Sequence, residues 1–374
     1  MMQMEYTTLD KISENLDSKR KPITSSDRVE GKIPYYGASG IVDYVKDYIF
    51  DESLLLVSED GANLLARSTP IAFSVTGKTW INNHAHVLRF SNENLQKFVE
   101  IYLNSISLES YVTGSAQPKL NQKMLNGIPI PVVDDSQIEI IVNSVENLKS
   151  IIEFRKQELA CLDDLIKARF VEMFGSIYDN KYGYNVMTLQ DVCEPIKDGT
   201  HQTPTYTEDT VNGFKFLSSK DVTSGKVDWD HLKYIPEELH NELYKRISPR
   251  KGDILLAKNG TTGVAAIVDR DEVFDIYVSL ALLKPLEMVT AEYLCSAVNS
   301  LETKHQFDHS LKGIGVPNLH LGEIKKTKII VPPIELQKQF ADFVHQVDKS
   351  KVVVQKALDE TQILFNSLMQ QYFG

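Results

Sequence analysis

The stretch IEIIVNSVENLKSIIEFRKQELACLDDLIKARFVEMF, residues 138–174, decides the fold. Its apolar residues recur with a 3-4-3-4 spacing, which is typical of a helix that buries one seam against a second helix. The seam positions are Ile138, Ile141, Val145, Leu148, Ile152, Arg155, Leu159, Leu162, Ile166, Arg169 and Met173, and nine of these eleven are apolar. Gly175 then supplies a stop signal. We therefore predict one long coiled-coil helix here.

The same pattern returns 199 residues further along the chain, where Phe373-Gly374 matches Phe174-Gly175. The corresponding seam positions are Gln337, Phe340, Val344, Val347, Lys351, Val354, Leu358, Thr361, Phe365, Leu368 and Tyr372. Two helices with matched seams bury them most simply against each other. Because the chain runs from Gly175 straight into a second globular segment, an antiparallel pairing is favoured over a parallel one. The polar seam residues Arg155, Arg169, Lys351 and Thr361 are candidates for fixing the register or for contacting partner proteins.

A strand-rich segment precedes each long helix. Leu55-Leu56-Val57 and Gly61 match Ile254-Leu255-Leu256 and Gly260 at the same offset. TLDKISENL (8–16) matches TLQDVCEPI (188–196) at an offset of 180, so the second segment holds 19 extra residues before Gly260. We predict a pseudo-twofold internal repeat of two α/β (α+β) domains, at 1–135 and 176–333, with spacer helices at 136–175 and 334–374.

Bulk composition narrows the classes of function. The formal net charge is -11, and none of the four segments is basic, so we expect weak binding to nucleic acid when this chain is alone. Local charge decides phosphate contact, however, so the acidic total does not exclude DNA. No apolar run is long enough for a membrane span, and no signal-peptide pattern is present. Three widely spaced cysteines indicate reduced thiols, and we expect a cytoplasmic protein.

Motifs for catalysis are weak in this chain. VTGKT (75–79) resembles the end of a phosphate-binding loop, but Ala72 stands where the first glycine is needed. Glu323-Ile324-Lys325, with Asp308 upstream, resembles the acidic–acidic–Lys set of metal-dependent nucleases, a pattern that is common by chance. His84 and His86 have the spacing of a metal pair on a strand, but no third ligand is close in sequence, and a structural or DNA-contacting role is favoured. We find no adenine-methyltransferase or helicase motif, and we predict no catalytic residue and no metal site.

Several glycine-rich or polar segments carry side chains suited to nucleic acid. These segments are IPYYGASG (33–40), KTWINNH (78–84), IKDGTHQTP (196–204) and LAKNGTTG (256–263). The candidate DNA-contacting residues of the first domain are Tyr36, Ser39, Lys78, Asn82, Asn83 and His84. Those of the second domain are Lys197, Thr200, His201, Lys220, Lys258, Asn259 and Thr261, and Lys119 and Lys312 are candidates for phosphate contact. The alternative for each segment is an ordinary surface turn.

The chain consists of two strand-rich segments, each followed by a long helix, and it contains the stretches IPYYGASGIVDYV, LLLVSEDG, FKFLSSKDV and KGDILLAKNGTTG. In these features it resembles the specificity subunits of Type I restriction-modification systems over essentially all 374 residues. The resemblance implies that each target recognition domain reads one half of a bipartite, asymmetric site in double-stranded DNA. It implies that the coiled coil sets the half-site spacing and docks two modification subunits, which bind S-adenosylmethionine and methylate adenine. Separate restriction and translocase subunits would use ATP and Mg²⁺, and this chain would hold no cofactor of its own.

Two other classes of function stay open. One is an enzyme, either a single-chain nuclease or a methyltransferase fragment, which a metal-dependent nuclease assay on the isolated chain would reveal. The other is a protein-interaction scaffold built on the same helices but unrelated to DNA, which would stay blind to DNA even with its partners present.

Overall fold

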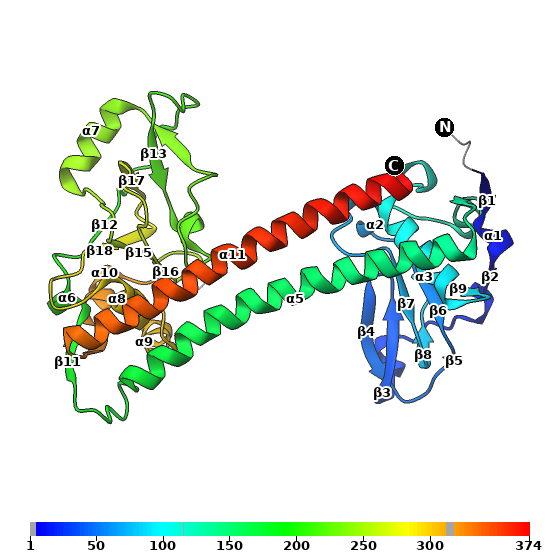
Figure 1. The fold of residues 1–374 in the computed structure, drawn as a ribbon, viewed down its shortest axis with the longest axis horizontal. Coiled ribbons are helices and arrows are strands. Elements are labelled where there is room, and N and C mark those ends of the chain that lie inside the picture. The colour runs from blue at the N-terminus through cyan, green and yellow to red at the C-terminus, as the bar shows by residue number, and fades with distance from the viewer. Residues whose placement is uncertain (1–4, 115, 312–317) are drawn as a thin grey trace. The chain divides into compact units, whose positions relative to one another are not determined.

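The chain forms two compact units in the structure, a computed structural model that describes residues 5–114, 116–311 and 318–374 (Figure 1). Unit 1 consists of Met1–Lys156 and Lys356–Gly374, and unit 2 of Gln157–Gln355. The two long helices are α5 (Asp135–Phe174) and α11 (Ile334–Phe373). Each unit therefore joins one strand-rich segment to part of both helices. The candidate Lys312 lies outside the described residues.

Unit 1 is built on three small sheets with the strand orders β1-β10, β2-β9-β6-β7 and β4-β3-β8-β5. Its strands are β1 Tyr6–Thr8, β2 Ser13–Asn15, β3 Glu30–Gly37, β4 Gly40–Val45, β5 Phe50–Asp51, β6 Leu54–Ser58, β7 Ala72–Val75, β8 Lys78–Ile81, β9 Ala85–Phe90 and β10 Pro129–Pro131. Its shorter helices are α1 Leu9–Ile12, α2 Asn63–Ala66, α3 Glu93–Ser105 and α4 Gln122–Asn126. Strand β6 is buried along its whole length because it is central in its sheet and covered on both faces.

Unit 2 has the strand orders β11-β19, β12-β18-β15-β16 and β14-β13-β17. Its strands are β11 Asn185–Thr188, β12 Lys197–Asp198, β13 Phe214–Leu217, β14 Lys233–Ile235, β15 Ile254–Ala257, β16 Ala265–Ile267, β17 Phe274–Ile276, β18 Leu280–Leu283 and β19 Lys328–Val331. Its shorter helices are α6 Leu189–Val192, α7 Glu237–Arg246, α8 Ala291–Val298, α9 Leu301–Ser310 and α10 Leu321–Lys326. Helix α7 lies between β14 and β15, in the region where the second segment has its extra residues.

The two units repeat one pairing scheme, which confirms the internal repeat. Strand β6 lies between β9 and β7, as β15 lies between β18 and β16. Strand β3 pairs in parallel with β8, as β13 does with β17. The N–H of Leu120 donates to the carbonyl of Glu59 at 2.8 Å, and the N–H of Leu319 donates to the carbonyl of Lys258 at 2.8 Å. Glu59 and Lys258 therefore occupy equivalent positions.

In each unit, the beginning of one long helix packs with the end of the other, so α5 and α11 run antiparallel. In unit 1, Ile138 and Val145 of α5 share a core with Phe365 of α11. In unit 2, the ring of Phe340 of α11 lies 5.4 Å from that of Phe174 of α5. All predicted seam positions of both helices are buried or half-buried. The heptad pattern therefore identified the buried face correctly.

The polar seam residues find partners within the helices. Lys351 is 8% exposed, and its Nζ lies 2.5 Å from an oxygen of Asp163 within unit 2. The hydroxyl of Thr361 donates to the carbonyl of Ala357 at 2.7 Å, and Arg169 pairs with Glu172 at 2.8 Å. The Lys351–Asp163 pair joins α11 to α5 and is suited to fixing their register.

All four of the glycine-rich or polar segments are partly strand, since Lys197-Asp198 form β12 and Leu256-Ala257 end β15. Residues Glu30–Gly37 form β3 and Lys78–Ile81 form β8, since their alternating apolar side chains pack into the core. Only Ala38-Ser39 and Asn82–His84 of these two segments lie in turns. No helix in the described part of the chain is long and apolar enough to span a membrane.

Candidate functional site

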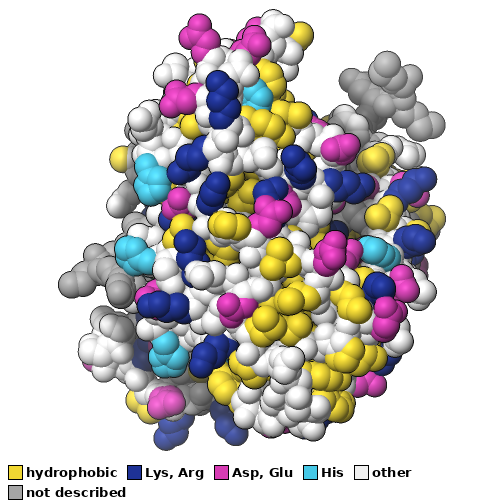
Figure 2. All heavy atoms as spheres, turned by 90° about the vertical axis from the view of Figure 1, so that its left-hand side faces the viewer, with side chains coloured by type: hydrophobic (Ala, Val, Ile, Leu, Met, Phe, Trp, Pro, Cys, Tyr) yellow, Lys and Arg dark blue, Asp and Glu magenta, His cyan; other side chains and the backbone are white. Residues whose placement is uncertain are grey.

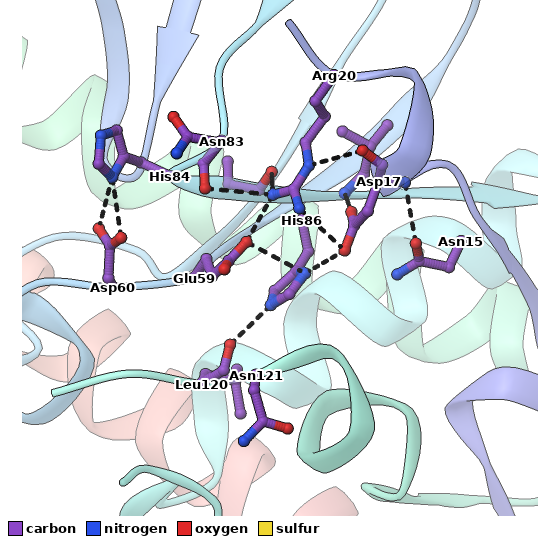
Figure 3. Close-up of polar contacts among 12 residues, drawn as sticks. Asn15, Asp17, Arg20, Glu59, Asp60, Asn83, His84, His86, Leu120 and Asn121 are labelled. Carbon is purple, nitrogen blue, oxygen red and sulfur yellow. Dashed lines mark hydrogen bonds and ion pairs between the residues drawn. The ribbon is translucent and has the colours of Figure 1, made fainter. Parts of the chain in front are cut away.

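A network of charged side chains lies at the end of β6 in unit 1 (Figure 3). The guanidinium of Arg20 donates to Glu59 at 2.6 Å and to the carbonyl of Ala85 at 2.8 Å, and lies 3.4 Å from Asp17. His86 is 1% exposed, with Nδ1 2.6 Å from Asp17 and Nε2 2.7 Å from the carbonyl oxygen of Leu120. The carboxylate of Asp17 and the carbonyl of Leu120 are both acceptors, so both ring nitrogens of His86 are placed to donate.

The pKa values of the two carboxyl groups follow from this arrangement. Burial by itself would raise the pKa of Asp17, but the hydrogen bond and the charge of His86, with the Val87 N–H and Arg20, lower it below the ordinary value. At Glu59, burial by itself would likewise raise the pKa, but Arg20, His86 and Lys119 lower it below the ordinary value. Both carboxylates are therefore ionised at neutral pH, and the network is a set of alternating charges.

The network is also the place where a metal could be suspected. Within the described residues, Asp17, Glu59 and His86 form the group of three potential ligands whose donor atoms lie within 4.8 Å of one another. The fold thus brings carboxylates to His86 that are distant in sequence. However, the Arg20 guanidinium already contacts both carboxylates, and both nitrogens of His86 are engaged in donation. These residues fit a closed ion-pair network better than a metal site.

The turn between β8 and β9 adjoins this network, because Arg20 also donates to the carbonyl of Asn83 at 3.4 Å. Asn82 is 6% exposed, and its side-chain oxygen accepts from the N–H of His84 at 2.8 Å. The side chain of His84 is 52% exposed, and its Nδ1 lies 3.0 and 2.9 Å from the two oxygens of Asp60. His84 and His86 therefore point to different carboxylates and do not form a metal pair. Asn83 and His84 are presented to solvent on a fixed turn.

Unit 2 has a simpler ion pair at the equivalent place. Asp198 pairs with Ala281 across β12 and β18, and its Oδ2 accepts from Nζ of Lys258 at 2.8 Å. His201 lies 3.3 Å from the same carboxylate and is exposed. Burial alone would raise the pKa of Asp198, but the hydrogen bond and charge of Lys258 lower it. Arg246 of α7 donates to the carbonyls of Asp198 and Gly199, which fastens this segment.

The predicted DNA-contacting residues divide into exposed and buried sets. Exposed side chains belong to Ser39, Lys78, Asn83, His84, Lys119, Lys197, His201, Lys220 and Thr261. Tyr36 and Asn259 are half-buried. Asn82, Thr200 and Lys258 are 6%, 9% and 7% exposed. These three are the least accessible candidates, and each already has a partner: Asn82 accepts from the N–H of His84, Thr200 Oγ1 accepts from the N–H of Gln202 at 3.3 Å, and Lys258 pairs with Asp198.

Sequence reasoning missed Asp17, Arg20, Glu59 and Asp60. A signal was available for two of them, since Glu59-Asp60 occupies the positions of Lys258-Asn259 at the offset of 199. Gly61 and Gly260 follow these pairs with φ angles of 108° and 76°, a conformation that favours glycine. Applying the repeat to the candidate residues themselves would therefore have identified the turn after β6.

Surface charge on the face of unit 2 in Figure 2 is mixed, with Lys and Arg side chains interspersed among Asp and Glu. An apolar area lies beside them. This distribution agrees with the net charge of -11 and provides no large basic surface on this face. Tight binding to a polyanion would need positive charge from elsewhere.

Comparison with known proteins identifies the class of this fold. The family model of the Type I restriction modification DNA specificity domain matches residues 1–163 and 181–361, and the chain belongs to this family. A putative type I restriction enzyme specificity subunit of Haemophilus influenzae is 28% identical over 359 residues, covering 92% of this chain and 88% of the relative. The MjaVIII specificity subunit of Methanocaldococcus jannaschii is 22% identical over 380 residues, covering 93% and 86%.

Solved structures show the same fold. The S subunit of a Type I restriction-modification system from M. genitalium has a TM-score of 0.62 at 14% identity, covering 100% of this chain and 97% of that one. A chain from a structural study of assembly and conformational transition in the type I R-M system has a TM-score of 0.58 at 15% identity, covering 100% and 98%. The predicted repeat of two mixed α/β segments with paired long helices is thereby confirmed.

Proposed function

We propose that this chain reads a bipartite, asymmetric site in double-stranded DNA, one half with each unit. The observation that carries this proposal is one framework used twice with different polar side chains at equivalent positions. Glu59 in unit 1 corresponds to Lys258 in unit 2, and the carbonyls of His84 and Ser279 accept from the N–H groups of Glu59 and Lys258 at 2.9 Å. Two copies of a scaffold that carry different side chains in equivalent turns suit two different targets.

Reading would use two kinds of contact. Exposed Asn83, His84, His201 and Thr261 are candidates for base edges in the major groove, where each base pair presents a distinct set of donors and acceptors. Exposed lysines such as Lys220 are candidates for phosphates, which fix register without reading sequence. The closed networks around Asp17 and Asp198 would hold the reading turns in one conformation.

The antiparallel helices would act as a spacer between the half-sites. A coiled coil of two long helices is stiff, and its length depends on the number of residues at about 1.5 Å each. The same helices carry exposed apolar residues outside the seam. In unit 1 these are Ile140, Ile151, Phe154, Ile363 and Leu364, and in unit 2 they are Leu165, Val171, Val352 and Val353.

These exposed residues support docking of two modification subunits. At the offset of 199, Phe154 of α5 corresponds to Val353 of α11, and Leu165 of α5 to Leu364 of α11, so each unit presents a related apolar patch. Exposed apolar surface of this kind is typical of interaction sites. Since the patches are repeated, two copies of one partner fit better than one.

Chemistry would reside in the partners. We propose that modification subunits bind S-adenosylmethionine and methylate an adenine flipped out of the stack, and that restriction subunits use ATP and Mg²⁺. This chain would then be a non-catalytic subunit that supplies the DNA sequence specificity. Partner subunits would also supply the positive charge that a chain of net charge -11 lacks.

Co-expression with the cognate Type I modification subunit, followed by sequencing of methylated bases in the host genome, tests the proposal. The expected result is one bipartite motif with a methylated adenine in each half. A stable complex that methylates no motif and binds DNA without sequence preference would contradict half-site reading and favour the protein scaffold. Metal-dependent cleavage of DNA by the isolated chain would instead favour the nuclease.

A further inference from the structure

We infer that Asp60 and His84 form a base-reading pair in unit 1, in which Asp60 orients His84 so that its Nε2 accepts from the exocyclic amino group of adenine or cytosine. This inference rests on the proposed function and deepens it. It assigns a chemical class of ligand to one side chain, and it gives Asp60 a positioning role.

The backbone at His84 is fixed from three sides. Its N–H donates to the side chain of Asn82 at 2.8 Å, and its carbonyl accepts from the N–H of Glu59 at 2.9 Å. The next carbonyl along, that of Ala85, accepts from Arg20 at 2.8 Å. Figure 3 shows His84 and Asp60 together at one side of the Arg20 network. A side chain on such a turn loses little freedom on binding, which favours specific recognition.

The ring of His84 is fixed as well. Its Nδ1 lies 3.0 and 2.9 Å from the two oxygens of Asp60, and a carboxylate can only accept. Nδ1 therefore carries the proton, and in the neutral ring Nε2 holds a lone pair. Among the described residues, none forms a hydrogen bond with Nε2 of His84, whose side chain is 52% exposed. The pair presents one oriented acceptor to solvent.

An oriented acceptor selects among base edges. In the major groove, adenine presents its N6 amino group and cytosine its N4 amino group, whereas guanine and thymine present acceptors at the corresponding places. An Nε2 lone pair is satisfied by either amino group and is left facing another lone pair at guanine O6 or thymine O4. The mismatch costs more than the lost hydrogen bond, because two acceptors are desolvated without partners.

Unit 2 lacks this device. Asn259 occupies the position of Asp60, since Asn259 bridges Asn318 as Asp60 bridges Lys119. Ser279 occupies the position of His84, and its hydroxyl accepts from the N–H of Ser219 at 2.9 Å. The preference that we infer should therefore appear in one half-site alone, and the other half-site is an internal control.

The test uses the assembled complex with its modification subunits and three variants. His84→Ala removes the reader, Asp60→Ala removes the orienting carboxylate, and Asp60→Asn keeps an oxygen that can accept from Nδ1. His231→Ala is the matched control, because His231 is an exposed histidine whose Nδ1 lies 3.1 Å from Asp228 in unit 2. Both His84 and His231 are exposed, so their removal should leave folding intact.

Methylome sequencing of each complex is the first readout. With His84→Ala, one A·T or C·G position of one half-site should become degenerate, while all other positions stay defined. Asp60→Ala should relax the same position, and Asp60→Asn should restore it. His231→Ala should leave that position unchanged. A uniform loss across the whole motif, or an unchanged motif with His84→Ala, would overturn the inference.

Binding to altered duplexes is the second readout. The base at the identified position is replaced by purine, which lacks the adenine amino group, or by 2-pyrimidinone, which lacks that of cytosine. The wild-type complex should lose affinity by about tenfold, as for one base-edge hydrogen bond, and the His84→Ala complex should bind both duplexes equally. Equal discrimination by both complexes would refute the role of His84. If the wild-type complex recognises no bipartite site, the proposed function itself is contradicted. This outcome is distinguishable from a failure of the inference about His84, because it is measured without any variant.

Discussion

At the scale of single residues, the two units neutralise a buried carboxylate with different cations. Asp17, just after β2, and Asp198, in β12, lie opposite the equivalent strands β9 and β18, and both carboxylates are largely buried. Unit 1 neutralises its carboxylate with His86 and Arg20, whereas unit 2 uses Lys258. Since a buried charge needs a partner, the cation at each position is a structural requirement. This explains why Lys258, a lysine in a glycine-rich turn, is buried and paired with Asp198.

Lys258→Met should destabilise unit 2 by about 3 kcal/mol, because it leaves the carboxylate of Asp198 buried without its main partner. Urea unfolding of the full chain measures the effect. The double variant Lys258→Met with Asp198→Asn should recover most of the loss, since no unpaired charge remains. A single variant that is as stable as the wild type, but binds DNA poorly in the complex, would show that Lys258 contacts phosphate after all.

Acid should weaken unit 1 through the same kind of interaction. The pKa of Asp17 is lowered in the folded state from 3.8, and that of Glu59 from 4.5. Lowered carboxyl pKa values stabilise the fold above the unfolded-state values, and the stabilisation is lost as pH falls through the folded-state values. The destabilisation caused by His86→Ala should therefore be large at neutral pH and smaller near about pH 3. Unfolding free energies measured across this range check the slope, and an equal effect at both pH values would contradict the ion-pair account.

At the scale of elements, the long helices were predictable and the site was not. A heptad repeat is a local signal, so Phe340 and Val145 could be assigned to the buried face from spacing alone. The network around Glu59 depends on residues 39 and 27 positions away, Arg20 and His86, which meet only when β2, β6 and β9 pair. No local pattern marks such a meeting. The exposure of Asn83 and His84 was anticipated because a short polar turn between strands has few ways to be buried.

The exposed face of the helices leads to a prediction about docking. Phe154 and Val353 are 68% and 69% exposed and occupy equivalent positions. Phe154→Asp and Val353→Asp should each reduce the bound modification subunits from two to one, and the double variant should bind none, because a carboxylate cannot be buried in an apolar interface without cost. Native mass spectrometry of the co-expressed complex gives the stoichiometry.

The matched control is Lys156→Asp, which changes the charge two positions from Phe154 and about 200° around the helix. Its side chain is exposed and pairs with Glu153 within the same helix. This variant should retain two modification subunits. Equal loss in the control would mean that charge on the helix, and not the apolar patch, decides docking.

At the scale of the whole molecule, the duplication gives a single chain two related DNA-reading units, as a symmetric dimer would have. Symmetric dimeric DNA readers recognise identical half-sites at a separation set by their geometry. A duplicated chain keeps that geometric control while each half is free to change, as the substitution of Asp60 by Asn259 and of His84 by Ser279 illustrates. Asymmetric target sites are the expected consequence.

The spacer role gives the last prediction. Inserting one heptad into α5 between Ile152 and Leu159, and one into α11 between Lys351 and Leu358, preserves both seams because each insertion repeats the apolar register. Seven residues add about 10.5 Å of helix, which corresponds to about 3 base pairs at 3.4 Å each. Methylome sequencing of the enlarged complex should therefore show both half-sites unchanged and a spacer longer by about 3 base pairs. The shortened counterpart, with one heptad removed from each helix, should recognise a spacer shorter by the same amount. Unchanged spacing in both variants would mean that the partner subunits, and not these helices, set the distance.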